Sequence, residues 1–173
     1  VALARDGVAQ NLIAFDMGGT STDIALVRDG QPAMSDGKTV ANARIALPSL
    51  DIVTLGAGGG SIGKLDRAGL LAVGPDSAGA DPGPACYGQG GTAATVTDAN
   101  LVLGRLDPRF FPSVFGPKGD RPLDPDAARA RLGDLAQAMG AASLEAAAEG
   151  FVAVAVEQMA QAVRRISTER GFD

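Results

Sequence analysis

Short apolar runs separated by turn residues fill the first third of the chain. Each run has the length and the flanking Gly, Pro or Asp residues that are typical of a β-strand. The runs occupy residues 12–16, 23–28, 32–36, 38–47 and 51–55. The first three follow one another so closely that only antiparallel hairpin connections fit between them. The run at 12–16 is continuously apolar up to its final Asp16 and has the length of a buried strand.

Helical periodicity dominates the last third of the chain. Asp124 followed by Pro125 is typical of a helix N-terminus, and Gly140 is typical of a helix end. Ser143 predicts the N-cap of a longer, final helix. The apolar residues of that helix recur every three or four positions, so they share one face over about six turns and predict a core-packing helix. They are Leu144, Ala148, Phe151, Ala155, Met159, Ala162 and Ile166.

The middle of the chain is rich in glycine and proline and predicts fewer regular elements. Residues 61–96 are interpreted as loops with one short strand at 70–73. A short helix is expected to begin at Thr97 or Asp98, because either side chain can cap a helix N-terminus. The prolines and glycines of residues 109–123 predict an excursion without regular structure. Loops of this length in a compact domain are usually functional or packed against something.

The most informative motif joins the first two predicted strands. It reads Phe15-Asp16-Met17-Gly18-Gly19-Thr20-Ser21-Thr22-Asp23. The glycine pair can adopt the positive φ of a tight turn and lets backbone N–H groups approach a bulky anion. The three hydroxyl residues add donors, and Asp16 and Asp23 can hold a hydrated divalent cation through oxygen ligands. An ordinary glycine-containing hairpin would explain the same residues, but we favour a nucleotide phosphate site.

A second glycine-rich segment imitates a P-loop. Residues 58–64 fit most of the pattern G-x-x-x-x-G-K-[ST], and their glycines also fit the dinucleotide pattern G-x-G-x-x-G. Both patterns require a helix directly afterwards, whereas glycine and proline interrupt residues 64–75 and no helical periodicity is present. Leu65 also stands where a P-loop has the Ser or Thr that binds Mg²⁺. We therefore favour neither the P-loop nor the dinucleotide interpretation, and the resemblance described below makes this segment a second glycine-rich turn.

Composition excludes several kinds of catalytic and metal site. Histidine is absent and Cys86 is the only cysteine, which excludes within this chain a Ser-His or Cys-His pair and the usual Cys/His zinc site. Cys86 lies in a Pro-Gly loop without a neighbouring base or cation, so we expect a buried, inert thiol. A net charge of -5 without a basic run argues against nucleic acid as a partner. The sequence shows neither a membrane span nor a signal peptide, so the expected location is the cytoplasm.

Four motifs, taken together and in order, resemble the hydantoinase A / 5-oxoprolinase family. They are Asp-Met-Gly-Gly-Thr-Ser-Thr-Asp at 16–23, Gly-Ala-Gly-Gly-Gly-Ser-Ile at 56–62, Ser-Ala-Gly-Ala-Asp-Pro-Gly-Pro-Ala-Cys-Tyr-Gly at 77–88 and Thr-Asp-Ala-Asn-Leu-Val-Leu-Gly-Arg-Leu at 97–106. Four ordered motifs are far more specific than any one of them. The resemblance covers essentially the whole chain.

The resemblance implies an actin-like, ribonuclease H-type ATPase fold. The expected fold class is α/β, half of an actin-like ATPase, with antiparallel hairpin strands at the front and helices at the back. In such folds each half supplies an Asp-x-Gly-Gly-Thr hairpin to one side of the nucleotide phosphates, and this chain contains one. Because family members are several times longer, residues 1–173 are expected to be a fragment of the ATPase domain of a longer protein and to be inactive alone.

The resemblance also implies roles for individual residues, with ATP and Mg²⁺ as cofactors. The predicted nucleotide-binding residues are Gly18, Gly19, Thr20, Ser21 and Thr22 around the β/γ phosphates, with Gly58 and Gly59 in a second turn beside them. Asp16 is the predicted catalytic carboxylate that holds Mg²⁺ or orients a water. Asp23 is the second catalytic candidate, in a metal-water role, although a solvent-facing Asp at a strand end fits it equally well.

The function implied is ATP-dependent opening of a cyclic amide of the hydantoin or 5-oxoproline type. The implied partners are the small cyclic substrate, the remainder of the protein's own chain and a hydantoinase B-like subunit or domain, with no nucleic acid and no membrane. The alternatives are an ATP-binding subunit of a ketone carboxylase and an enzyme related to sugar or acetate kinases. A non-catalytic subunit that only senses nucleotide is a further possibility.

Overall fold

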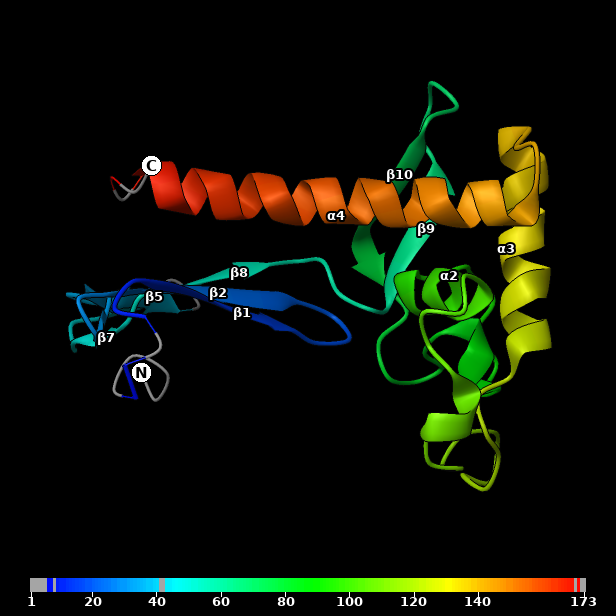
Figure 1. The fold of residues 1–173 in the computed structure, drawn as a ribbon, viewed down its shortest axis with the longest axis horizontal. Helices are drawn as coiled ribbons and strands as arrows, with labels where there is room; N and C mark the ends of the chain where they lie inside the picture. The colour runs from blue at the N-terminus through cyan, green and yellow to red at the C-terminus, as the bar shows by residue number, and fades with distance from the viewer. Residues whose placement is uncertain (1–5, 8, 41–42, 170, 172–173) are drawn as a thin grey trace. The chain divides into compact units, whose positions relative to one another are not determined.

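The computed structural model describes residues 6–7, 9–40, 43–169 and 171, and it has two compact units. Unit 1 comprises Val1–Asp16, Thr22–Leu55 and Ala162–Asp173, and unit 2 comprises Met17–Ser21 and Gly56–Gln161. The model is α/β with antiparallel strand pairing, as the sequence predicts (Figure 1).

The sheet of unit 1 is built around one central strand, β2 (Thr22–Arg28). It lies between β1 (Leu12–Met17) and β3 (Gln31–Pro32), and it also pairs antiparallel with β8 (Ile52–Leu55). Asp29 and Gly30 connect β2 to β3 with φ values of 50° and 76°. Positive φ at both positions is the requirement of a type I′ two-residue hairpin turn, for which Asp-Gly is a favoured sequence.

Two small strand pairs complete unit 1, and they correct two sequence predictions. β4 (Met34–Ser35) pairs with β7 (Ser49–Leu50), and β5 (Lys38–Val40) pairs with β6 (Ala43–Ile45). The predicted strand 38–47 is therefore a hairpin whose two halves bond to each other, and residues 41–42 of that prediction lie outside the described residues. The predicted strand 32–36 is likewise divided between β3 and β4.

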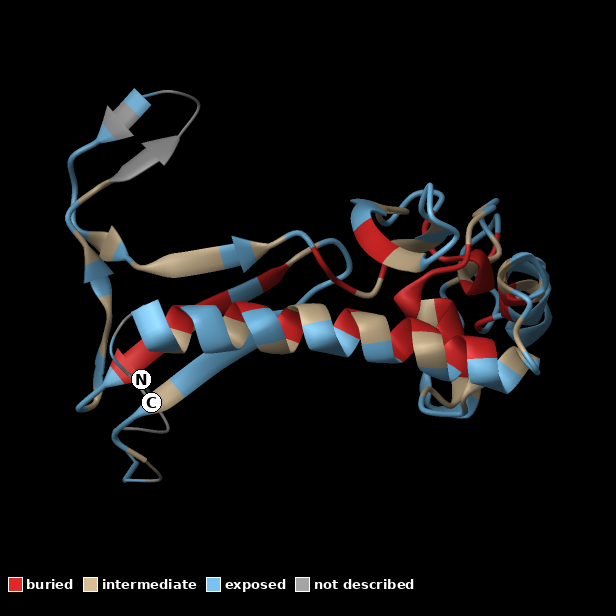
Figure 2. Ribbon diagram, turned by 90° about the horizontal axis from the view of Figure 1, so that it is seen from above, coloured by how far each residue is buried: buried red, intermediate tan, exposed pale blue. Residues whose placement is uncertain are grey.

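Burial distinguishes the first two strands. Ile24 and Leu26 of β2 are buried against Ala162 and Ile166 at the C-terminal end of the last helix. By contrast, every residue of β1 except Leu12 is exposed, although its sequence predicts a buried strand. β1 lies at the edge of the described sheet, where Ile13, Phe15 and Met17 are 39–45% exposed, and Figure 2 colours the exposed positions pale blue.

Unit 2 contains a strand that the sequence analysis missed. β9 (Ser61–Leu65) pairs antiparallel with β10 (Leu71–Ser77), within the region predicted as loops with one strand at 70–73. Gly63 of β9 lies against the Phe151 ring, so closely that an added Cβ would overlap the ring. Gly63 argues against a strand in the sequence, but in the structure it is the residue that lets a large aromatic side chain pack on β9.

Three helices form the rest of the framework of unit 2. They are α2 (Val96–Val102), α3 (Pro125–Met139) and α4 (Leu144–Glu169), of which only residues 144–161 belong to this unit. Asp124 caps α3, Gly140 ends it in the left-handed conformation, and the Ser143 hydroxyl accepts the Ala146 N–H, so these predictions are confirmed. Two short 3₁₀ turns, Ala85–Tyr87 and Pro108–Phe110, are the only helical segments among the described loop residues 78–94 and 104–123.

The apolar face predicted for α4 is buried as expected. Ala148, Phe151 and Ala155 are at most 2% exposed and pack with Val96 and Ala99 of α2, and Figure 2 shows buried and exposed positions alternating along the helix. Within the described residues no single helix is long and apolar enough to cross a membrane. α3 and α4 meet that test of length and composition only as a pair, and they are bent by 86° at the break between them.

Candidate functional site

The turn between β1 and β2 is held by its carbonyl groups. Within Met17–Ser21, the Gly18 N–H donates to Ser21 O at 2.8 Å. The Gly18 carbonyl accepts the Gly59 N–H at 3.0 Å, and the Gly19 carbonyl accepts the Gly60 N–H at 2.6 Å. Two successive peptide groups of the turn are therefore anchored from the carbonyl side to the second glycine-rich segment.

That second segment, Gly56–Ser61, is itself fixed by unit 2. The Gly59 carbonyl accepts both the backbone N–H of Thr97 at 2.8 Å and its hydroxyl at 2.9 Å. The Ser61 hydroxyl accepts the Gly58 N–H at 2.9 Å, and the Gly60 carbonyl accepts the Ala78 N–H at 2.8 Å. The N-terminal end of α2 and the end of β10 thus both position the support of the Met17–Ser21 turn.

Close approach explains why glycines occupy this segment. A Cβ at Gly58 would stand 2.6 Å from Gly18 O and 2.8 Å from Gly19 O, and one at Gly59 would stand 2.8 Å from the Thr97 hydroxyl. Real Cβ atoms do not tolerate such distances. The glycines therefore allow one backbone segment to pack closely on another. This segment is not a P-loop, because strand β9 follows it where a P-loop has a helix.

The opposite side of the Met17–Ser21 turn is open. Gly18, Gly19 and Thr20 are exposed, and the N–H groups of Gly19 and Thr20 donate to no described residue. A Cβ at Gly19 would meet no described atom within 4 Å. Neither Gly18 nor Gly19 has a positive φ, so the prediction that this turn needs glycine for its backbone conformation is wrong. What Gly19 offers is a bare, accessible peptide surface.

The predicted carboxylates lie in unit 1. Asp16 is exposed and directly precedes the turn in sequence. Asp23 is also exposed, and its Oδ1 accepts the hydroxyl of Thr54, its partner across β2 and β8, at 2.6 Å. Thr22 is fully buried, unlike the exposed Thr20. Its hydroxyl is therefore poorly placed to reach a ligand.

No group of three or more Asp, Glu, Cys or His side chains gathers within the described ranges as a metal site. A magnesium ion that enters with a nucleotide needs fewer protein ligands, because it is commonly bound by one or two carboxylates together with phosphate oxygens and waters. A single exposed carboxylate at Asp16 is compatible with that donor set.

A buried carboxylate that the sequence analysis did not recognise organises the start of α2. Asp98 is completely buried and accepts four hydrogen bonds, from Ala85 N at 3.2 Å, Cys86 N at 2.8 Å, Thr95 N at 3.0 Å and the Thr95 hydroxyl at 2.8 Å. Thr95, and not Thr97 or Asp98, is the N-cap, and Asp98 completes a capping box with it. The spacing Thr-x-x-Asp was the available signal.

The same network explains the state of the only cysteine. Burial raises the pKa of the Cys86 thiol far above its ordinary value, and the neighbouring Asp98 carboxylate raises it further. A thiol that stays protonated is a poor nucleophile. The structure therefore confirms Cys86 as a buried, inert side chain.

Residues 1–173 match the family model described as hydantoinase/oxoprolinase along their whole length. The chain belongs to the hydantoinase/oxoprolinase family. This member is 47% identical over 166 residues to the 5-oxoprolinase PfmaA of Pestalotiopsis fici, covering 93% of this chain and 13% of that protein. It is 45% identical over 164 residues to the caprolactamase subunit alpha of Pseudomonas jessenii, covering 94% of this chain and 23% of that subunit.

Two solved structures resemble this family member closely. The ATP-dependent caprolactamase of Pseudomonas jessenii gives a TM-score of 0.82 at 43% identity, and the nucleotide-free structure of an acetone carboxylase that carries out ATP-dependent acetone carboxylation gives 0.82 at 28% identity. Each alignment covers 99% of this chain and 24% of the other chain. The chain therefore spans a quarter or less of the relatives it matches.

Proposed function

We propose that this chain is part of an enzyme that hydrolyses ATP to open a cyclic amide ring, and that it supplies one side of the phosphate site. The observation that carries the proposal is the Met17–Ser21 turn, which is anchored through carbonyls and presents unused N–H groups. Successive backbone N–H groups of an exposed glycine turn are typical phosphate ligands. The 43% identity to an ATP-dependent caprolactamase supports the choice of ATP and of a cyclic amide.

The roles follow from where the donors lie. The N–H groups of Gly19 and Thr20 and the hydroxyls of Thr20 and Ser21 would hold phosphate oxygens, while Gly58 and Gly59 hold the turn from behind. Asp16 would carry Mg²⁺, and Asp23 would act more remotely, through water. When bound, ATP supplies a phosphoryl group that can turn the amide oxygen into a leaving group. The residues of this chain contribute positioning and charge neutralisation, which are the main requirements of phosphoryl transfer.

The fold proposed for this site is half of an actin-like, ribonuclease H-type ATPase. Support comes from the antiparallel order β1-β2-β3, with the glycine turn joining the first two strands. The opposing phosphate hairpin would come from another part of the protein. Residues 1–173 would accordingly be a fragment of a larger ATPase domain.

A ketone carboxylase subunit is the second candidate, because the acetone carboxylase matches with the same TM-score of 0.82. The higher sequence identity to the caprolactamase favours the amidohydrolase. The name of the caprolactamase subunit alpha supports a partner subunit, and we propose that this partner is hydantoinase B-like. The proposed location is the cytoplasm.

The test is substrate-dependent ATP hydrolysis by the whole protein with its partner subunit. ADP formation is measured with ε-caprolactam, 5-oxoproline, hydantoin, or acetone plus bicarbonate, and product analysis identifies the opened ring. Stimulation by a cyclic amide, with ring opening matched to ADP, supports the proposal. Stimulation only by acetone and bicarbonate would transfer the assignment to a carboxylase, and a phosphorylated stable product would indicate a kinase.

A further inference from the structure

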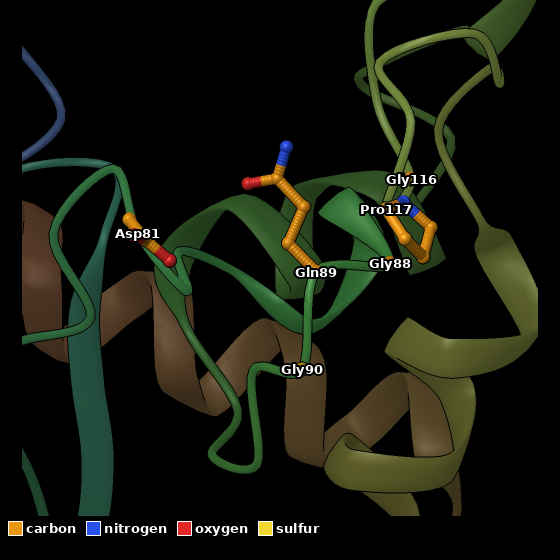
Figure 3. A pocket seen from close by; sticks show the side chains of 6 residues that line it. All are labelled: Asp81, Gly88, Gln89, Gly90, Gly116 and Pro117. Atoms are coloured by element: carbon orange, nitrogen blue, oxygen red, sulfur yellow. The ribbon is translucent and has the colours of Figure 1, made fainter.

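Two loops of unit 2 line an open surface recess of about 650 Å³ that no residue of the Met17–Ser21 turn lines. Its lining residues are Asp81, Gly88, Gln89, Gly90, Gly116 and Pro117. Figure 3 shows the Gln89 carboxamide projecting into this recess, with the Asp81 side chain on one flank and Pro117 on the other. Recesses of 300–1,000 Å³ are the usual size of small-molecule sites.

The polar groups of the recess favour a neutral ligand. Asp81 and Gln89 are exposed, and neither side chain makes a hydrogen bond or ion pair with any described residue. A carboxylate only accepts hydrogen bonds, whereas a carboxamide both donates and accepts. None of the six described lining residues is cationic, so the recess is unsuited to phosphate. A ring amide is complementary, because ring closure places its N–H and C=O on one edge.

The walls of the recess are held in place before any ligand binds. The Gly116 N–H donates to Tyr87 O at 2.7 Å and joins the two loops, and the rings of Tyr87 and Phe115 lie 4.8 Å apart. Asp98 fixes the backbone at Ala85 and Cys86, just before the recess. Such a frame lowers the entropy cost of ordering a binding site.

A continuous set of backbone hydrogen bonds links the recess to the Met17–Ser21 turn. The Gly60 N–H donates to Gly19 O at 2.6 Å, and the Gly60 carbonyl accepts the Ala78 N–H at 2.8 Å. The Ala78 carbonyl in turn accepts the Gly83 N–H at 3.2 Å, which closes the loop that carries Asp81. A phosphoryl acceptor must be held close to the nucleotide, and this loop is bonded to the segment that supports the turn.

We infer that the recess binds the cyclic amide, with Gln89 Nε2 donating to the ring carbonyl and the Asp81 carboxylate accepting the ring N–H. This assignment rests on the proposed function and adds the substrate position to it. The bare backbone of Gly88 and Gly90, with φ values of 63° and 101°, lets the planar amide group of a ring approach. The volume also leaves room for substituents on the ring.

The test uses the whole protein with its partner subunit and two independent readouts. One is the KM for ε-caprolactam and for ATP in the coupled hydrolysis reaction. The other is direct binding of ε-caprolactam, measured by ligand-observed NMR, with cycloheptanone, a ketone of the same ring size, as a matched probe that lacks the N–H. The variants are Gln89→Leu and Asp81→Asn, with Gln137→Leu and Asp126→Asn as controls on exposed positions of α3.

Gln89→Leu is expected to weaken caprolactam binding and raise its KM by about tenfold, the effect of roughly one lost hydrogen bond. Asp81→Asn should act in the same direction but less, since an acceptor oxygen remains. The KM for ATP and both controls should be unchanged. If both variants bind lactam normally and retain lactam-dependent ATP hydrolysis, the recess is not the lactam site, and the proposed function is unaffected. If lactam binding depends on Gln89 but no lactam-dependent hydrolysis occurs, the recess binds lactam and the proposed function is wrong.

Discussion

Replacing Asp98 by alanine should open the start of α2 and the loop that leads to the recess. The carboxylate is fully buried and accepts four hydrogen bonds. Hydrogen bonds to charged groups contribute about 1.5–3 kcal/mol each. Because neighbouring bonds are not additive and Thr95 supplies two of the four donors, we expect a local cost of about 4 kcal/mol. Asp98→Asn keeps the shape and one acceptor, so it should cost roughly half as much.

Hydrogen exchange followed by mass spectrometry of the whole protein measures this cost locally. A loss of about 4 kcal/mol corresponds to nearly a thousandfold faster exchange in residues 85–102. Asp124→Ala is the matched control, since it removes an exposed N-cap that accepts two N–H bonds and should cost about 1 kcal/mol in α3. If Asp98→Ala exchanges no faster at 85–102 than Asp124→Ala does in α3, the four-bond network does not hold this region.

Three further predictions concern single side chains. Thr97→Val should raise the KM for ATP several-fold, at about 1 kcal/mol for its bond to Gly59 O, and Thr97→Ser should restore it; equal impairment of both variants in steady-state assays would remove this bond from the account. Lys64→Ala should change ATP hydrolysis by less than about tenfold, because Lys64 forms an exposed pair with Asp76 at 2.5 Å; a loss of several orders of magnitude would restore the P-loop interpretation. Cys86 should resist thiol reagents at pH 8 in the folded protein, and its raised pKa should make stability fall as the pH rises above about 8.5, where the unfolded thiol ionises; labelling as fast as a free thiol would contradict this.

Local signals in the sequence were sufficient for both ends of α3, for the start of α4 and for the hairpin turn after β2, but not for the start of α2. Asp124, Gly140 and Ser143 define helix ends through bonds to their own neighbours, so their positions follow from residue type and spacing. Asp29 and Gly30 similarly specify their hairpin turn. The Met17–Ser21 turn could be predicted as a candidate phosphate site for the same reason, because its glycines and hydroxyls are contiguous.

Features that depend on distant partners could not be predicted in this way. β9 contains Gly63, which in a sequence pattern argues against a strand. Only the position of the Phe151 ring explains why glycine stands there. The anchoring of Gly18 and Gly19 on Gly59 and Gly60 joins segments about 40 residues apart, for which the sequence carries no local pattern. The exposure of β1 was also missed, because apolar composition reports a preference for burial and not which element provides the cover.

Binding of Mg-ATP to a Gly19→Val variant of the whole protein would show whether the Met17–Ser21 turn holds the phosphates. The fold should accept valine, because Gly19 has no positive φ and a Cβ there meets no described atom within 4 Å. A bound phosphate would lose its contact with the turn, so calorimetry should show at least about a hundredfold weaker binding, the equivalent of one or two charge-assisted bonds, and a larger loss than for Asp16→Ala. Gly133→Val is the control, since Gly133 in α3 also has open space around it. An unchanged dissociation constant for Gly19→Val would mean that this turn does not bind the phosphates.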